Sequence, residues 1–61
     1  MLSAREREVM LLVGEGLSNK EIAGRLGISD NTVRVHLQRI YWKLRIPNRQ
    51  MLAVLAASES N

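Results

Sequence analysis

Apolar residues recur at helical spacing in four successive segments of the chain. Val33, Leu37, Ile40 and Leu44 follow one another at intervals of four, three and four residues, so one helix face stays apolar for three turns. Shorter runs of the same kind occupy the other segments, and no alternating pattern typical of a strand is present. The pattern predicts an all-α domain with helices over about residues 4–13, 19–26, 30–45 and 49–57.

Helix-capping residues precede each of these segments. Two segments begin with the Ser-x-x-Glu spacing of a capping box, in which the serine and glutamate side chains each bind the other residue's backbone N–H. The other two begin with a serine or an asparagine, which also accept hydrogen bonds from the first helical turn. The N-caps predicted in this way are Ser3, Ser18, Ser29 and Asn48.

The predicted helices end at residues that favour a turn. Gly14 and Gly16 are expected to supply the positive φ that ends the first helix, and Gly27 the positive φ that ends the second. Pro47 is expected to stop the third helix, because its ring nitrogen has no hydrogen to donate. Residues 58–61 are expected to form a frayed tail.

The length and composition of the chain narrow the classes of function. Its 61 residues make a single domain over residues 1–61, and 46% apolar residues suffice for a packed core. So short a chain has no room for both a core and a concave pocket, so we expect no enzyme, cofactor or small-molecule ligand. It has no cysteine and a single histidine, His36, so we expect no metal site. No membrane span or signal peptide is recognisable, which favours a cytoplasmic binding module.

The positive charge is confined to one segment. Nine lysines and arginines against six acidic residues give a net charge of +3, and residues 31–49 hold five of the basic residues and no acidic one. Such a stripe is typical of nucleic-acid binding, although a solvated helix face can look the same, and charge alone favours neither. The alternating run Arg5-Glu6-Arg7-Glu8 is interpreted as a solvated face with surface ion pairs.

The second and third predicted helices have the spacing of a helix-turn-helix motif. Ala23 is small where the two helices must approach, and Gly27, four residues later, allows a left-handed turn. Val33, six residues further on, is the apolar anchor of the following helix. The basic segment falls on that helix, which is the one that enters the major groove in such motifs.

The outer side of the third helix carries side chains suited to reading bases. Arginine can bind guanine O6 and N7, glutamine can bind adenine, and valine can contact the thymine methyl group. The free N–H groups at the helix N-terminus favour a phosphate. At about 100° per residue, the residues on this side are Asn31, Arg34, Val35, Gln38, Arg39, Trp42 and Arg45.

Five motifs follow one another along nearly the whole chain without a gap. They are Leu2-Ser3-x-Arg5-Glu6-x-Glu8-Val9, Gly16-Leu17-Ser18-Asn19-Lys20-Glu21-Ile22-Ala23, Ile28-Ser29-x-x-Thr32-Val33-Arg34-x-His36-Leu37, Ile40-Tyr41-x-Lys43-Leu44 and Asn48-Arg49. Together they resemble the LuxR-type (NarL/FixJ-type) DNA-binding domain. The resemblance implies the output domain of a bacterial transcriptional regulator, of the response-regulator or quorum-sensing type. It also implies that the third helix reads the major groove and that the fourth pairs two copies on two half-sites.

Carried over position by position, the resemblance implies two sets of contacts to double-stranded DNA. The base-reading residues would be Arg34, Val35, Gln38 and Arg39. The phosphate-binding residues, with two that we add from the N-terminus of the third helix, would be Asn19, Lys20, Ser29, Asn31, Thr32 and Lys43. Most members also carry an upstream receiver or small-molecule-binding domain, which does not fit in this chain. That domain, RNA polymerase and a location at the bacterial nucleoid are further expectations.

The fourth helix and Trp42 depart from a simple core pattern. Met51, Val54 and Leu55 would suit an ordinary core, but with Leu52 they make the helix apolar on more than one face. This is how a small dimer interface looks, so we expect a homodimer through the first three of these residues. We expect Trp42 to cover the end of the fourth helix or to contact a partner domain, in preference to stacking near the DNA backbone.

Two other functions fit part of the pattern. A protein-interaction module could keep the helix-turn-helix shell and bind or antagonise a related regulator. The segment 31–49, which holds Arg34, Gln38 and Arg39 and no acidic residue, favours DNA instead. The domain of sigma factors that reads the promoter −35 element uses a similar motif, but residues 19–23 and His36 are closer to the LuxR-type pattern.

Overall fold

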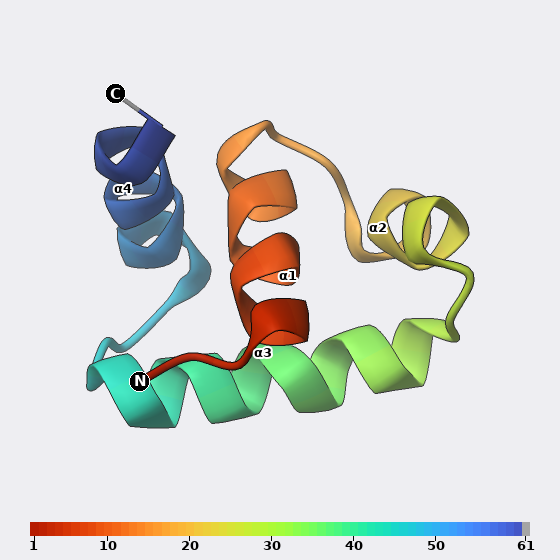
Figure 1. The fold of residues 1–61 in the computed structure, drawn as a ribbon, viewed down its shortest axis with the longest axis horizontal. Coiled ribbons are helices and arrows are strands. Elements are labelled where there is room, and N and C mark those ends of the chain that lie inside the picture. The colour runs from red at the N-terminus through yellow and green to blue at the C-terminus, as the bar shows by residue number, and fades with distance from the viewer. Residues whose placement is uncertain (61) are drawn as a thin grey trace.

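Four helices joined by short turns make up the fold (Figure 1). The computed structural model describes residues 1–60, with side chains up to Glu59. The helices are α1 (Ala4–Gly14), α2 (Asn19–Leu26), α3 (Asp30–Leu44) and α4 (Arg49–Ser60), and residues 1–60 contain no strand. The predicted all-α fold is confirmed, and every helix boundary agrees with its prediction to within one residue except the end of α4.

The end of α4 is more ordered than the expected frayed tail. The helix continues through residues 58–60 instead of ending near residue 57, and residue 61 lies outside the described part of the chain. Glu59 in this last turn forms an ion pair with Arg7 of α1. The prediction was wrong for residues 58–60 because it considered only the polar composition, whereas a side chain far away in sequence contacts this turn.

Side chains cap the start of every helix as expected. At α2, the Glu21 N–H donates to Ser18 Oγ at 3.1 Å, and the Ser18 N–H donates to Glu21 Oε1 at 2.8 Å. A second capping box starts α1, and single side-chain caps start α3 and α4. A cap of this kind typically contributes about 1 kcal/mol. The predicted N-caps are therefore all confirmed, at Ser3, Ser18, Ser29 and Asn48.

Three helices end in the same backbone reversal, which places one residue in the left-handed region. Gly16, with φ 88°, and Gly27, with φ 69°, do this after α1 and α2, as predicted. α3 ends at Leu44, and Arg45 adopts φ 55° two residues before Pro47, so the reversal precedes the proline that was expected to cause it. The closing hydrogen bonds run from Leu17 N to Leu12 O at 3.2 Å, from Ile28 N to Ala23 O at 3.0 Å and from Ile46 N to Tyr41 O at 3.0 Å.

Gly14 serves helix packing and not the turn. It lies inside α1 without a positive φ, so the prediction that its φ ends the helix is wrong. A Cβ atom built on it would lie 2.6 Å from the Cβ of Ala56 in α4, closer than two carbon atoms can approach. Glycine therefore allows the end of α1 to lie directly against α4.

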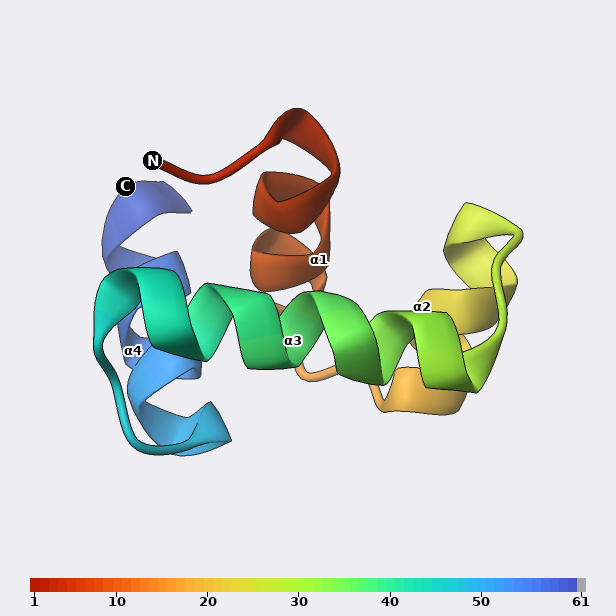
Figure 2. The ribbon, with the colours of Figure 1, turned by 90° about the horizontal axis from the view of Figure 1, so that it is seen from below.

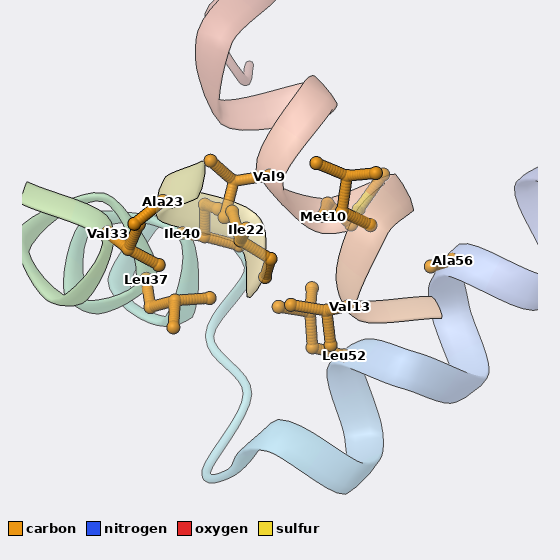
Figure 3. Packing of buried hydrophobic residues seen from close by; sticks show 11 residues of the cluster. Val9, Met10, Val13, Ile22, Ala23, Val33, Leu37, Ile40, Leu52 and Ala56 are labelled. Carbon is orange, nitrogen blue, oxygen red and sulfur yellow. The ribbon is translucent and has the colours of Figure 1, made fainter. Parts of the chain in front are cut away.

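A single hydrophobic core lies among the helices, and α1 contacts each of the other three (Figure 3). Val33, Leu37 and Ile40 are buried as predicted, and Leu44 is partly buried at the edge. Full burial of a side chain of this size contributes about 1.5–3 kcal/mol. The largest fully buried side chains come from all four helices: Val9, Ile22, Val33, Ile40 and Leu52.

α3 is the longest helix, and no other helix covers one of its sides (Figure 2). α1 packs behind it, while α2 lies toward its N-terminal end and α4 toward its C-terminal end (Figure 2). Within the described residues, no helix is long and apolar enough to cross a membrane. The architecture thus leaves a straight, uncovered helix surface available for contacts.

Candidate nucleic-acid interface

The turn between α2 and α3 is set by three small or apolar residues. Ala23 and Val33 are buried against each other's helices, and Gly27 between them is left-handed. No atom lies within 4 Å of a Cβ built on Gly27, so its positive φ, and not lack of space, favours glycine there. These three residues hold α3 at a fixed angle to α2, as a helix-turn-helix motif requires.

The uncovered side of α3 presents the side chains predicted to read bases. Arg34, Gln38 and Arg39 are exposed, and Val35 is exposed beside them. Residues 31–49 hold no acidic residue, and two of their basic residues, Arg34 and Arg39, are exposed on this side, so it is electropositive. The buried residues of the same helix point into the core, which fixes the direction in which the outer side chains project.

The N-terminal ends of α2 and α3 carry most of the predicted phosphate-binding residues. Lys20 and Asn31 are exposed. Ser29 Oγ accepts the Thr32 N–H at 3.0 Å, and the two hydroxyl oxygens lie 2.9 Å apart. Both hydroxyls therefore already stabilise the first turn of α3, which carries free N–H groups favourable to an anion.

Arg49 is a residue whose position sequence reasoning did not anticipate. Its guanidinium donates to Asn19 Oδ1 at 2.6 Å and to the Leu17 carbonyl at 2.8 Å, and so joins the start of α4 to the start of α2. It orients Asn19 by the amide oxygen, which leaves the amide N–H groups as donors for a phosphate. The signal was the Asn48-Arg49 motif, which had been counted only as part of the family resemblance. A hollow of about 240 Å³ next to these groups is lined by Asn19, Arg34, Leu37, Gln38, Tyr41 and Arg49.

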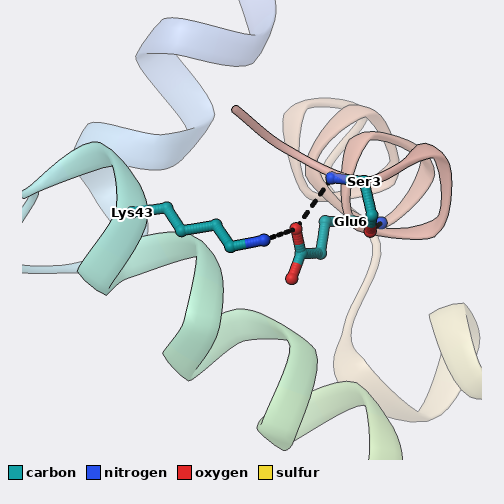
Figure 4. A network of polar contacts seen from close by, with 3 residues as sticks. All are labelled: Ser3, Glu6 and Lys43. Carbon is teal, nitrogen blue, oxygen red and sulfur yellow. Dashed lines mark hydrogen bonds and ion pairs between the residues drawn. The ribbon is translucent and has the colours of Figure 1, made fainter.

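Lys43 forms a partly buried ion pair that was not predicted (Figure 4). Its Nζ lies 2.8 Å from Glu6 Oε1, which also accepts the Ser3 N–H at 2.9 Å. Glu6 is only 3% exposed, so its interpretation as part of a solvated face is wrong. The hydrogen bond from Lys43, and then the one from the Ser3 backbone, lower the pKa of Glu6 from 4.5 to about 2.

The neighbours of Glu6 do behave as a solvated face. Arg5 and Glu8 are exposed and lie 4.0 Å apart, and Arg7 is about half exposed in its pair with Glu59. Glu6 differs because a capping box directs its side chain back over the helix start, toward α3. Alternation of charge along the sequence could not reveal that contact, because Lys43 lies 37 residues away.

The apolar residues proposed for dimerisation lie on the outer side of α4. Val54 is 64% exposed, and Met51 and Leu55 are also exposed, so they are not ordinary core. Their spacing places them on one helix face. In contrast, Leu52 and Ala56 of the same helix are buried, and Ala53 is partly buried.

Two further side chains of α3 that the sequence analysis singled out are Trp42 and His36. Trp42 is 81% exposed, which contradicts the first of its two expected roles, covering the end of α4, and the contact with a partner domain stays a prediction. His36 is half-buried on the flank of α3, and its Nδ1 is buried without a hydrogen-bond partner in the described structure. Within the described residues, no group of three or more histidine and acidic residues gathers to hold a metal ion.

Known proteins of the same kind match nearly the whole chain. The model of a family described as bacterial regulatory proteins, luxR family, matches residues 1–56. A Mycobacterium tuberculosis protein named as an HTH-type transcriptional regulator is 52% identical over 56 residues, covering 92% of this chain and 6% of that protein. The nitrate/nitrite response regulator protein NarL of Escherichia coli is 40% identical over 58 residues, covering 95% of this chain and 27% of NarL.

A solved structure supports the same relationship. The response regulator ChrA of a heme-sensing two-component system matches with a TM-score of 0.86 and 43% identity, over 98% of this chain and 29% of ChrA. The chain thus spans well under a third of the length of each of these proteins.

The fold and the uncovered basic helix define the class of this protein as a helix-turn-helix DNA-binding domain of a transcriptional regulator. More specifically, the chain belongs to the luxR family of bacterial regulatory proteins, which bind DNA and are not enzymes. The resemblance predicted from the five sequence motifs is confirmed.

Proposed function

We propose that the chain binds specific DNA sequences by placing α3 in the major groove. The observation that carries this proposal is the uncovered side of α3, where Arg34, Gln38 and Arg39 are exposed without an acidic neighbour from residue 31 to residue 49. A merely solubilising helix face normally mixes both signs of charge. The family relationship supports the same function.

The proposed DNA contacts are of two kinds, which have different roles. Contacts to phosphates set the position of the domain on the duplex, and contacts to base edges select the sequence. The base-reading residues would be Arg34, Val35, Gln38 and Arg39. The phosphate-binding residues would be Asn19, Lys20, Ser29, Asn31, Thr32 and Lys43. Lys43 has three N–H donors, so its bond to Glu6 leaves two for a phosphate.

Pairing of two copies through α4 would supply the affinity that one copy lacks. A single module of this size buries about 600–1,000 Å² of its surface on DNA, which favours weak binding. The exposed residues Met51, Val54 and Leu55 form an apolar face that a second copy could cover by two-fold symmetry. A paired protein would then occupy two half-sites, with the second bound at high effective concentration.

We place this module in a larger regulatory setting. In that setting an upstream receiver or ligand-binding domain controls it, and it acts on transcription at the bacterial nucleoid, with RNA polymerase as a further partner. The relatives support the setting, because this chain corresponds to only a small part of each of them.

The test is selection of bound sequences from a pool of random duplex DNA at 50 and 200 mM salt. The expected result is enrichment of inverted repeats, with affinity that falls steeply as salt rises. Wild type should be compared with Val54→Glu, which places a charge in the proposed dimer face and lies outside α3. That variant should enrich single half-sites with lower affinity.

The other outcomes are equally informative. Salt-dependent binding without enrichment would contradict sequence reading by the isolated domain. Absence of binding at 50 mM salt would contradict the DNA-binding role and favour the protein-interaction alternative.

A further inference from the structure

Two features at the C-terminal end of α3 are not explained by the fold. Trp42 is 81% exposed, although tryptophan is the largest apolar side chain. Arg45 is the only residue other than glycine with a positive φ within residues 1–60. A left-handed conformation is unfavourable for any residue with a Cβ atom, and the corresponding turns after α1 and α2 use glycine. A strained, charged residue next to an exposed aromatic one points to a contact outside the domain.

Trp42 continues the side of α3 that is proposed to read bases. Trp42 lies four residues after Gln38 and seven after Val35, and residues at these intervals share one helix face. Trp42 is therefore displaced from Gln38 by about 6 Å along the helix axis. Arg45 is the C-cap that follows Leu44, and it lines the same hollow as Trp42. Trp42 thus extends the base-reading surface toward the end of the helix, where Arg45 lies beside it.

The length of α3 determines what this end would meet. Its 15 residues span about 22 Å, whereas the major groove is about 12 Å wide. If the N-terminal turns of α3 contact base edges, as in other helix-turn-helix proteins, the C-terminal turns lie beyond the bases. The groove is bordered there by the sugar–phosphate backbone. The position of Trp42 near the C-terminal end of α3 therefore fits a contact with the DNA backbone.

We infer that Trp42 and Arg45 bind the DNA backbone at the edge of the groove, outside the bases that α3 reads. The inference depends on the proposed DNA-binding function. The indole ring would cover a deoxyribose, with its N–H available to a phosphate oxygen, and the Arg45 guanidinium would pair with a neighbouring phosphate. The hollow at this end is lined by Met1, Tyr41, Trp42, Lys43 and Arg45 and holds no acidic residue. Lys43 in this lining is paired with Glu6, so Arg45 supplies the positive charge that suits a polyanion.

Trp42 is the only tryptophan of the chain, so its fluorescence reports this contact directly. The probe is a 20-base-pair duplex of arbitrary sequence at 50 mM salt, since a backbone contact needs no particular operator. Binding is measured independently by the anisotropy of a dye on the DNA. We expect the emission of Trp42 to shift or quench along the same titration curve. Binding without any change in Trp42 emission would overturn the inference and leave the proposed function intact.

Substitutions of Trp42 and Arg45 distinguish an effect on DNA binding from an effect on the stability of the fold. Trp42→Ala should weaken binding by roughly three- to tenfold at an unchanged salt slope, because it removes no charge. Arg45→Gly should lower the salt slope by about 0.9, the loss of one phosphate contact. It should also raise the melting temperature by roughly 4–8 °C, because glycine relieves the left-handed strain. A higher melting temperature together with weaker DNA binding would not be expected if Arg45 had only a structural role.

A matched control removes the same charge elsewhere. Arg25 is exposed in the last turn of α2 and borders a hollow shared with α1, away from the outer side of α3. Arg25→Ala should leave the salt slope within error of wild type. Equal effects of Arg25→Ala and Arg45→Gly would overturn the inference, because they would show a general charge effect. Unchanged DNA affinity in Trp42→Ala would also overturn it and would assign this end of α3 to a protein partner.

Discussion

The two sides of α3 are built from the same helix but are subject to different constraints. On the inner side, Val33, Leu37 and Ile40 are buried, and each is surrounded by residues of other helices. On the outer side, Arg34 and Gln38 are exposed, so they could be exchanged without leaving a cavity in the core. Packing therefore selects the inner residues, and it does not select the outer ones.

This difference separates stability from recognition within 15 residues. A change on the inner side should alter how much protein is folded and leave the preference for DNA sequence unchanged. A change on the outer side should do the reverse. The following variants test this separation, beginning with the largest expected effect.

Ile40→Ala should give the largest loss of stability among these variants. Ile40 is fully buried, so truncation leaves a cavity in the core where α3 packs. The expected cost is about 2–5 kcal/mol, measured by urea denaturation followed by circular dichroism. For a domain of this size, such a loss can leave much of the protein unfolded.

Val35→Ala is the matched control on the outer side of the same helix. It removes an apolar side chain that is already exposed, so the change in unfolding free energy should stay within about 0.5 kcal/mol. If Val35→Ala destabilised the domain as much as Ile40→Ala, the two sides would not differ as proposed.

Arg34→Ala should cost about 1–3 kcal/mol of binding free energy on the selected DNA site and relax the preference at one base pair. Its stability should remain close to that of wild type, because the side chain is exposed. Affinities for the selected site and for the three alternatives at each base pair measure the binding effects, and urea denaturation measures stability.

Arg34→Lys distinguishes the shape of the side chain from its charge. Lysine keeps the charge but not the planar fork that binds guanine through two atoms, so it should keep the salt slope and still lose base preference. A lysine variant with full base preference would show that base reading does not require the planar fork of Arg34.

Local signals explain how much of this structure could be predicted from the sequence. A capping box such as Ser18 with Glu21 involves residues three apart, and the apolar spacing along α3 reflects one helix face. The left-handed Gly27 follows from a glycine placed directly after an apolar run. Helix boundaries and the helix-turn-helix motif could therefore be predicted from the sequence, because short-range contacts determine them.

Contacts between distant segments explain what could not be predicted. Gly14 was interpreted as a turn residue because the close approach of Ala56 depends on how α1 packs on α4. Glu6 was placed in solvent because Lys43 approaches it only in the folded chain. The same reason applies to Arg49 beside Asn19. Among the candidate site residues, exposure follows from helix periodicity, but the partners of polar groups do not.

The Glu6–Lys43 ion pair connects α3 to the start of α1, because Lys43 belongs to α3 and Glu6 is part of the capping box of α1. The pKa of Glu6 is lowered from 4.5 to about 2, so the folded state favours the charged carboxylate. Its contribution to stability is complete above about pH 4.5 and is lost as pH falls toward 2. Glu6→Gln should therefore melt below wild type at pH 6, by a margin that shrinks as pH approaches 2.

Melting temperatures of wild type and Glu6→Gln between pH 2 and pH 6 test this expectation, because the other carboxylates titrate in both proteins. In a protein that carries Lys43→Gln, adding Glu6→Gln should lower the melting temperature at pH 6 by less than it does in wild type. The reason is that Lys43→Gln removes the hydrogen bond that lowers the pKa of Glu6 most. A margin that stays constant from pH 6 to pH 2 would contradict the role of this pair.

Lys20→Ala should have the smallest effect, and it completes the comparison because Lys20 lies outside α3 altogether. It is exposed at the start of α2, so the fold should not change measurably. Loss of one phosphate contact should lower the salt slope by about 0.9, which between 50 and 200 mM salt corresponds to a roughly threefold difference in affinity. All DNA sequences should lose affinity alike, because a phosphate carries no base identity. If Lys20→Ala changed the preference among sequences, base reading would not be confined to the outer side of α3.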